Sequence, residues 1–139
     1  MILKQYNCTK KLKAFTLMEV LIVIGVIGIL MLIALPNLMP LITKAKSLEA
    51  KIQLKFISNL QTQYRFINSK YSTELNDIDY EAPKTVHDGG TANYRYDLIE
   101  ASPTSFTARA EAVVDFDGDG VFNVWEIDQN GVPKEIIKD

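Results

Sequence analysis

Residues 13–36 read KAFTLMEVLIVIGVIGILMLIALP, and this stretch decides how the rest of the sequence is interpreted. Its apolar part, 15–35, has 21 residues and a single charged side chain, Glu19. A helix of that length extends roughly 30 Å, the hydrocarbon thickness of a bilayer. A surface helix of a soluble protein has one apolar face, whereas this segment is apolar on every face. The sequence therefore predicts a membrane-embedded helix over 15–35.

The segment before the apolar helix is a basic leader. Residues 1–14 contain four lysines and no acidic residue, and they hold Cys8, the one cysteine. A basic flank stays on the cytoplasmic side of a membrane, so we expect the N-terminus inside and the bulk of the chain outside. Removal of 1–14 leaves 11 of the 15 basic side chains against 17 acidic ones, a net charge of −6. An acidic exterior does not attract nucleic acid, and we expect no such partner.

The order of these segments is the reverse of that in a secretory signal peptide. A secretory signal has a short apolar region followed by a cleavage site of small residues. Here a small residue, Ala14, comes before the apolar run, and Pro36-Asn37 follows the run. Cleavage on the basic side would leave the whole apolar helix on the product, which would begin at Phe15.

Glu19 is the second unusual feature of this segment. An ionisable group inside an apolar helix costs a few kcal/mol and marks a functional site whose partner has to be named. Cleavage before Phe15 would supply such a partner, an α-amine four residues upstream or the same amine on a neighbouring copy. The other interpretation is that Glu19 reaches the nearby membrane interface. The residues alone favour neither.

The run Lys13-Ala14-Phe15-Thr16-Leu17-Met18-Glu19, the apolar segment after it and Pro36 resemble the N-terminus of type IV pilins and type II secretion pseudopilins. In that family a membrane aspartic peptidase cuts between a small residue and Phe and then N-methylates the Phe. The resemblance implies cleavage between Ala14 and Phe15 and methylation of Phe15. It implies that Glu19 pairs with the N-terminal amine of the adjacent subunit during assembly. Pro36 falls where the family commonly has proline, and Ala14 falls where it usually has glycine.

The resemblance also implies a location and a set of partners. It implies a single pass through the bacterial inner (cytoplasmic) membrane, with the lipid bilayer around the helix, and processing by a prepilin peptidase/methyltransferase. Copies of the chain would then form a homopolymer, a periplasmic or surface filament, with an inner-membrane assembly platform and minor pilins. The short head, its lack of a disulfide and its acidic loop favour a type II secretion pseudopilin of the major type. The alternative is a true type IV pilus pilin for adhesion, motility or DNA uptake.

The helical pattern continues past the apolar run, which predicts a continuation of the helix over 36–68 beneath a globular head. Pro36 and Pro40 each remove a backbone donor and should kink or loosen the helix between them. Apolar side chains then recur at spacings of three and four. We expect the head to cover the single stripe that they form, which consists of Ala45, Leu48, Ile52, Phe56, Leu60, Tyr64 and Ile67.

The remainder, 69–139, predicts an irregular linker followed by an antiparallel sheet. The linker, 69–90, contains His87, which we interpret as a solvated loop residue. Alternation at 94–99 and 106–114 and the β-branched and aromatic residues at 121–127 predict strands. Asn130-Gly131 predicts a hairpin turn, and Pro133 assigns the last stretch to an edge strand. The fold class is therefore α+β, a long N-terminal helix packed against a three- to four-stranded antiparallel sheet.

The loop 115–126 matches the twelve-residue calcium-binding template of the EF-hand. Its flanks alternate as strands instead of helices, and a strand would carry Glu126 more than about 10 Å beyond the turn. The calcium ligands that we expect are therefore Asp115, Asp117 and Asp119 with backbone oxygens, and Asn123 is a further candidate. The alternative is a turn that uses Asp and Gly for its conformation.

The sequence contains no nucleophile–base constellation and no phosphate-binding glycine loop, so we expect no enzymatic activity. Calcium is the one cofactor that the residues suggest. A rival from another functional class is a membrane-tethered calcium-binding module that does not polymerise. The filament hypothesis requires Glu19 for assembly, whereas the tethered-module hypothesis requires Asp117 and leaves Glu19 without a role.

Overall fold

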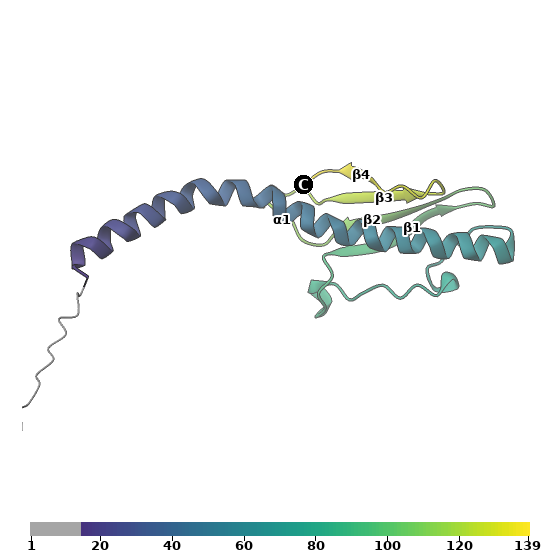
Figure 1. The fold of residues 1–139 in the computed structure, drawn as a ribbon. Coiled ribbons are helices and arrows are strands. Elements are labelled where there is room, and N and C mark those ends of the chain that lie inside the picture. Colours follow the sequence, from purple (N-terminus) through teal and green to yellow (C-terminus); the bar gives the residue numbers. More distant parts are fainter. Residues whose placement is uncertain (1–14) are drawn as a thin grey trace, which may run out of the picture. The chain divides into compact units, whose positions relative to one another are not determined.

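The structure, a computed structural model, describes residues 15–139 and divides into two compact units. The first unit ends at Asn37, and the second runs from Leu38 to Asp139. One long helix, α1 (Leu17–Asn68), begins in the first unit and continues into the second (Figure 1). The predicted long helix is thus confirmed. The helix does not end at Pro36 or Pro40, and a kink between them stays a prediction. The basic leader, 1–14, lies outside the described residues.

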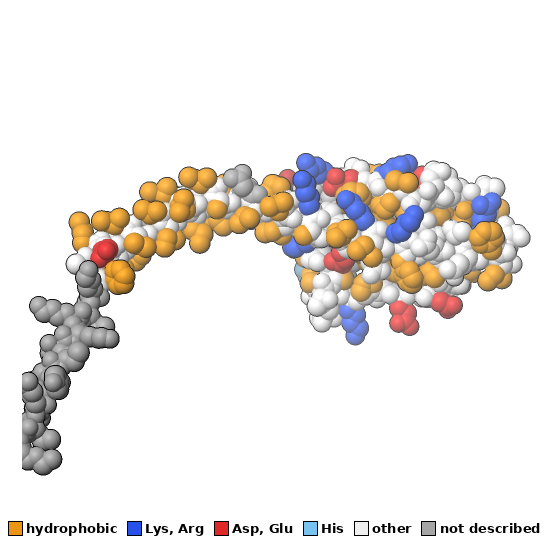
Figure 2. Space-filling model, in the orientation of Figure 1, with side chains coloured by type: hydrophobic (Ala, Val, Ile, Leu, Met, Phe, Trp, Pro, Cys, Tyr) orange, Lys and Arg blue, Asp and Glu red, His pale blue; other side chains and the backbone are white. Residues whose placement is uncertain are grey.

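The described part of the first unit is an apolar helix with an exposed surface. All of its side chains from Phe15 to Pro36 are exposed, and Figure 2 shows hydrophobic groups around the helix. The segment Leu17–Pro36 has a mean hydropathy of 2.9 and is the one helix of the described chain that is long and apolar enough to cross a membrane. A surface of this extent is stable only when lipid or other apolar helices cover it.

The second unit packs α1 against a four-stranded antiparallel sheet in the order β1-β2-β3-β4. The strands are β1 (Tyr94–Ala101), β2 (Phe106–Ala112), β3 (Val124–Asp128) and β4 (Lys134–Ile137). Successive strands pair, with Tyr96 opposite Ala110 and Ala110 opposite Trp125. This arrangement confirms the α+β class and makes β4 an edge strand, as Pro133 predicts.

The core lies between α1 and one face of the sheet. From α1, Ala50, Leu54 and Ile57 are fully buried. From β2, Phe106 and the alternate alanines that follow it face the helix, because side chains of a strand alternate between its two faces. Small side chains on a central strand allow the helix to approach closely, and larger aromatic residues of β1, such as Tyr94, fill the flank.

The prediction that the apolar stripe is the buried face of α1 is mostly wrong. The buried face follows Ser47, Ala50, Leu54, Ile57 and Gln61 instead. Gln61 can be buried because its amide exchanges two hydrogen bonds of 2.9 Å with the backbone of Ser72. The sheet thus covers a face of small and polar residues. The exposed members of the predicted stripe are Ala45, Leu48, Ile52, Phe56 and Ile67, while Leu60 and Tyr64 are partly buried.

The linker, which we define as 69–93, runs from the end of α1 to β1 along the β1 side of the helix (Figure 1). It contains two short 3₁₀ turns, Asn76–Ile78 and Val86–Asp88. Tyr80 fixes its middle, because its ring lies 6.1 Å from that of Phe56 and its hydroxyl donates to Gln53 Oε1. The linker is therefore attached to α1 through side chains.

Candidate functional site

The N-terminal end of the described chain holds two of the residues predicted to act in processing and assembly. Phe15 is 78% exposed, and Glu19 lies in the first turn of α1. The backbone N–H of Glu19 donates to Thr16 Oγ1 over 3.2 Å, which satisfies one of the free donors at the helix start. About one helical turn separates Phe15 from Glu19. Ala14, the other residue of the predicted cleavage site, lies outside the described residues.

Glu19 has the position that suits a carboxylate at this end of a helix. The first turn carries the partial positive charge of the helix dipole, which favours a negative side chain there. Glu19 is exposed, as is Pro36 at the far end of the apolar segment. A cationic group on a neighbouring molecule could therefore approach Glu19 without displacing any part of the described chain.

The acidic loop between β2 and β3 is organised around Asp115. The backbone N–H of Gly118 donates to Asp115 Oδ1 over 2.6 Å, and that of Gly120 donates to Oδ2 over 2.7 Å. The two glycines have φ angles of +85° and +88°, which side chains rarely tolerate. Donation by Gly120 and then Gly118 lowers the pKa of Asp115. The loop is thus closed around an ionised carboxylate.

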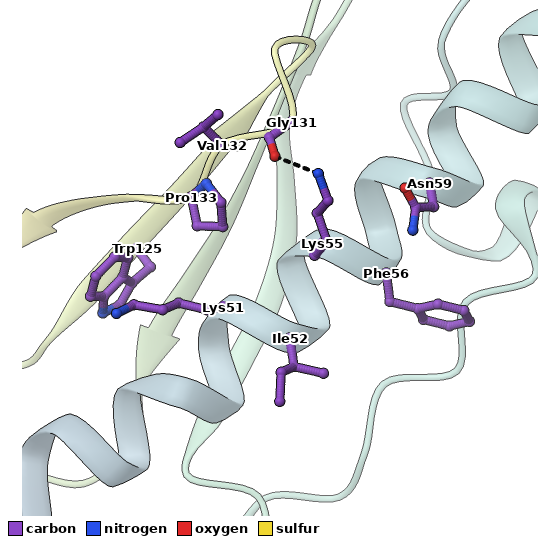
Figure 3. A pocket seen from close by; sticks show the side chains of 9 residues that line it. All are labelled: Lys51, Ile52, Lys55, Phe56, Asn59, Trp125, Gly131, Val132 and Pro133. Atoms are coloured by element: carbon purple, nitrogen blue, oxygen red, sulfur yellow. Dashed lines mark hydrogen bonds between the residues drawn. The ribbon is translucent and has the colours of Figure 1, made fainter.

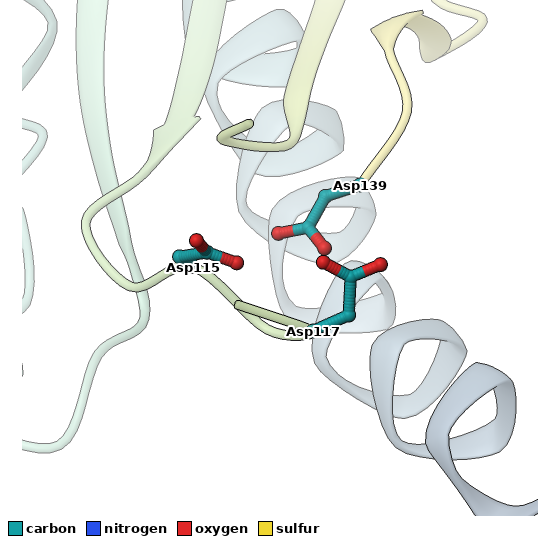
Figure 4. Close-up of side chains that lie close together, drawn as sticks. All are labelled: Asp115, Asp117 and Asp139. Carbon is teal, nitrogen blue, oxygen red and sulfur yellow. The ribbon is translucent and has the colours of Figure 1, made fainter. Parts of the chain in front are cut away.

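A second segment completes a carboxylate cluster at this loop. Oxygen atoms of Asp115, Asp117 and Asp139 lie within 4.8 Å of one another (Figure 4). The backbone N–H of Phe116 donates to Asp139 Oδ2 over 2.9 Å, while Asp139 Oδ1 is buried with no hydrogen-bond partner. Among residues 15–139 this is the one group of acidic, His or Cys side chains close enough to share a metal ion.

The pKa of Asp117 records the repulsion within this cluster. The N–H of Asp119 donates to Asp117 Oδ1 and by itself lowers the pKa. Desolvation and the nearby charges of Asp119, Asp139 and Asp115 outweigh that hydrogen bond and raise the pKa of Asp117 above its ordinary value. A cation would remove this repulsion.

The structure does not bring Asp119 or Asn123 into the cluster. Asp119 instead accepts the backbone N–H of Val121 over 2.7 Å. Asn123 is fully buried, and its Oδ1 accepts hydrogen bonds from Tyr94 and Trp125 over 2.7 Å and 2.6 Å. The Asn123 amide is thus occupied in the core. Asp139, 23 residues from Phe116, is the cluster member that loop spacing could not indicate.

Glu126 of the acidic loop and His87 of the linker both form hydrogen bonds within the head. Glu126 lies in β3, where its Oε1 accepts two hydrogen bonds from Arg109 over 2.8 Å and 2.6 Å, so it does not close the loop. His87 is exposed, and its Nε2 lies 2.7 Å from the carbonyl oxygen of Val113. This contact joins the linker to the end of β2.

Comparison with known proteins agrees with these features. The family model described as the prokaryotic N-terminal methylation motif matches residues 9–35. The type IV major pilin protein PilA of Myxococcus xanthus (strain DK1622) is 37% identical over 68 residues, 49% of this chain and 31% of that protein. The type II secretion system core protein G of Aeromonas hydrophila is 30% identical over 89 residues, 58% of this chain and 62% of that protein. The matches thus span less than two thirds of either relative.

In its methylation motif, its apolar helix and its helix-on-sheet head, the chain is similar to the type IV pilin and pseudopilin family. The two named relatives come from different branches of that family, one a pilin and the other a secretion protein. By name, one is a major pilin and the other is a core protein of a secretion system.

Proposed function

We propose that this chain is a structural subunit of a type IV pilin-like filament, and that the filament is the pseudopilus of a type II secretion system. The observation that carries the proposal is the exposed apolar helix Leu17–Pro36, which has Glu19 in its first turn and continues into a folded head. An apolar helix of this kind is held by lipid before assembly and by other copies of itself afterwards. The copies would exchange lipid contacts for helix contacts.

Processing would prepare the subunit for this exchange. A prepilin peptidase would cut between Ala14 and Phe15 and methylate the new N-terminus. The Phe15 amine of one copy would then neutralise the Glu19 carboxylate of its neighbour, which removes the cost of a charge in an apolar core. The basic leader would hold the N-terminus in the cytoplasm until cleavage, with the head on the outer side of the inner membrane.

Three features support the pseudopilus over the pilus. The head has no cysteine, the sheet has four strands, and the acidic loop contacts the segment after β4. The alignment with the secretion protein also covers more of this chain than the alignment with the pilin. A true type IV pilus pilin is the alternative, and the exposed apolar helix serves it equally.

We also propose that the cluster of Asp115, Asp117 and Asp139 binds calcium. The three carboxylates, which include the unpartnered Oδ1 of Asp139, form an oxygen-only donor set, which hard divalent cations prefer. When bound, the ion would supply positive charge that joins the acidic loop to the segment after β4. In a head without disulfides this link would stabilise the fold.

The substitution Glu19→Ala tests the filament proposal. We expect normal membrane insertion and cleavage, because the substitution leaves Ala14 and Phe15 intact, and loss of sheared filaments, because the neighbour's amine loses its partner. The matched control is Glu100→Ala, which removes an exposed glutamate of β1 and should leave filament yield unchanged. Normal filaments from Glu19→Ala cells would contradict the pairing of Glu19 with the neighbouring amine.

A further inference from the structure

A groove on the β4 side of α1 contains two lysines that have no acidic partner in the described chain. The groove has a volume of about 700 Å³ and lies between α1 and the β3–β4 hairpin. Lys51 reaches toward Trp125, with Nζ 4.3 Å from the ring centroid, and Lys55 donates to the carbonyl oxygen of Gly131 over 2.8 Å (Figure 3). Val132 and Pro133 line the hairpin side, so an apolar wall stands beside the two charges.

These two lysines can take further anionic partners. An ammonium group has three donors, and neither lysine forms an ion pair within residues 15–139. Their spacing of four residues places two like charges on neighbouring positions of the helix, which is unfavourable until an anion lies between them. The contacts with Trp125 and Gly131 hold both side chains on the hairpin side, so the site is preformed.

The opposite flank of α1 has the complementary charge. The linker, 69–93, contains two lysines and five acidic residues, a net charge of −3, whereas residues 38–68 of α1 contain five basic residues and one acid, a net charge of +4. Figure 2 shows acidic side chains at the lower edge of the second unit, where Figure 1 places the linker. The one acid of this part of α1, Glu49, accepts hydrogen bonds from Asn93.

Within the linker, Asp79 and Glu81 are the acids best placed to meet a partner. Both are exposed, no hydrogen bond or ion pair engages their carboxylates, and Tyr80 between them is buried. Asp79 has a left-handed backbone (φ 54°) at the end of the 3₁₀ turn Asn76–Ile78, so the two acids project from an exposed turn on either side of Tyr80. The Asp79–Glu81 pair therefore presents two negative charges to the two positive charges of Lys51 and Lys55.

The basic and acidic pairs of one molecule do not meet. Ile52 and Phe56 line the helix side of the groove, and their exposed side chains point away from the hairpin (Figure 3). The Phe56 ring packs on Tyr80 of the linker, and within residues 15–139 no ion pair joins Asp79 or Glu81 to the two lysines. The acidic loop between β2 and β3 is a weaker partner for the groove, because backbone N–H groups and the cluster with Asp139 already engage Asp115.

We propose that the groove formed by Lys51, Lys55 and the β3–β4 hairpin binds the Asp79–Glu81 segment of a second copy of this chain. The two surfaces differ, so the contact is heterologous, and after one contact one copy keeps a free acidic segment and the other keeps a free groove. Such a contact extends into a ring or an open helical assembly and does not stop at a dimer. This inference rests on the proposed filament function, for which it names the contact between neighbouring heads.

Charge reversal in the full-length chain, in cells that assemble wild-type filaments, tests the contact. Lys51→Glu with Lys55→Glu, and separately Asp79→Lys with Glu81→Lys, should each reduce the yield of sheared filaments by roughly tenfold or more, because like charges then face each other across the contact. The four substitutions together should restore the yield. The control is Lys70→Glu with Lys84→Glu, which changes the net charge by the same amount as the Lys51 and Lys55 reversals but at linker positions outside the proposed contact. This variant should assemble normally.

Cross-linking identifies the occupant of the groove. In a Cys8→Ser background, Lys55→Cys combined with Glu81→Cys should give disulfide-linked dimers and higher multimers in filaments, while each cysteine alone should give none. Loss of filaments on lysine reversal without rescue or cross-linking would overturn the proposal and assign the groove to another acidic partner. An unchanged filament yield in both charge-reversed pairs, Lys51→Glu with Lys55→Glu and Asp79→Lys with Glu81→Lys, would overturn it as well. Absence of both sheared and periplasmic filaments of this chain from wild-type cells would instead contradict the proposed function.

Discussion

The acidic loop shows at the scale of single residues what local sequence predicts and what it misses. The Asp-x-Asp-Gly-Asp pattern locates Asp115 and Asp117 and explains the glycines, because the Asp115 carboxylate needs the N–H groups of Gly118 and Gly120. It does not indicate Asp139, since that residue reaches the loop only through the pairing of β3 with β4. Tertiary structure therefore supplies a ligand that no motif contains.

Asn123 illustrates the opposite error at the same scale. Its position in the calcium template suggests a ligand, but the structure uses every part of its amide in the core. Nδ2 donates to Glu135 Oε1 and to the carbonyl oxygen of Ile137, and Oδ1 accepts from two aromatic side chains. A buried Asn with satisfied hydrogen bonds stabilises the head, and its residue type alone cannot distinguish that role from metal binding.

Calcium should raise the melting temperature of the full-length chain in detergent micelles. At a calcium concentration a hundredfold above the dissociation constant, binding adds about 2.7 kcal/mol, which corresponds to a shift on the order of 10 °C for a head of this size. Asp139→Asn should abolish most of this shift, because it removes the charge of the ligand with the free oxygen. Calorimetry with and without a chelator measures it. An undiminished shift in Asp139→Asn would assign calcium to other residues.

Without calcium, the neutral substitution Asp117→Asn should stabilise the loop at neutral pH. The folded-state pKa of Asp117 is raised, so its favourable contribution exists below the unfolded value of about 3.9 and is lost as the pH rises through the folded value. Asp115 acts in the opposite sense, because its folded-state pKa is lowered and its contribution is lost on acidification. Calorimetry at pH 7 in chelator should show a higher melting temperature for Asp117→Asn and a lower one for Asp115→Asn. The reverse order would contradict the electrostatic account.

At the scale of elements, α1 carries two apolar stripes, and only one is buried by the sheet. The stripe with the larger side chains, which includes Leu48, Ile52 and Phe56, is exposed. The buried stripe includes Ser47 and Gln61, which lower its apparent hydrophobicity. Periodicity identifies a helix and its possible faces, but the choice of face depends on which side chains fit the alanines of β2 and which polar groups find partners.

Two leucines of α1 test this assignment of faces. Leu54 is fully buried and Leu48 is 55% exposed, and both lie in the same helix. We expect Leu54→Ala to lower the free energy of unfolding of the head by about 3 kcal/mol through lost burial and a cavity. Leu48→Ala should change it by less than about 0.5 kcal/mol. Chemical denaturation of the full-length chain in micelles measures both, and equal losses would contradict the observed face.

The strands were easier to predict than the helix face, and for a physical reason. The period-two pattern at 94–99 and 106–114 leaves one choice of buried face, so Tyr94 and Phe106 point into the core as expected. The turn before β4 follows from Gly131, whose φ is +71°. The strand predicted from Val121 begins only at Val124, because the Asp115 loop uses the backbone of the preceding residues.

At the scale of the whole molecule, the head depends on buried tyrosines. Burial is the main cause that raises the pKa of Tyr94 to about 12 and that raises the pKa values of Tyr80 and Tyr96 further. The Tyr94 hydroxyl donates to Asn123, and the nearby charge of Glu49 adds to burial in raising the pKa of Tyr96. All three hydroxyls therefore stay protonated in the folded head.

The head should unfold cooperatively at alkaline pH. A raised folded-state pKa means that the stabilising contribution is complete below the unfolded value of about 10 and is lost as the pH rises through the folded values. Tyrosinate absorbance and circular dichroism should thus change together in one transition above about pH 10. Independent titration of all tyrosines with intact secondary structure would contradict this packing.

The two units of the chain differ in how fully the sequence predicts them. The apolar helix and its flanks could be assigned from the sequence, because a bilayer imposes a simple rule of length and composition. The head could not be predicted in full from the sequence. The buried face of α1, the carboxylate cluster and the groove all depend on residues that are far apart in the chain. The proposed contacts between copies depend on both units.

Mass spectrometry of filaments sheared from the source cells tests the central claim most directly, because it reads the N-terminal peptide and the abundance of this chain together. The account predicts a processed chain that begins with N-methylated Phe15 and is assembled in the filament fraction, or in a periplasmic filament when secretion is the role. An unprocessed chain that retains residues 1–14 and is confined to the membrane would contradict it.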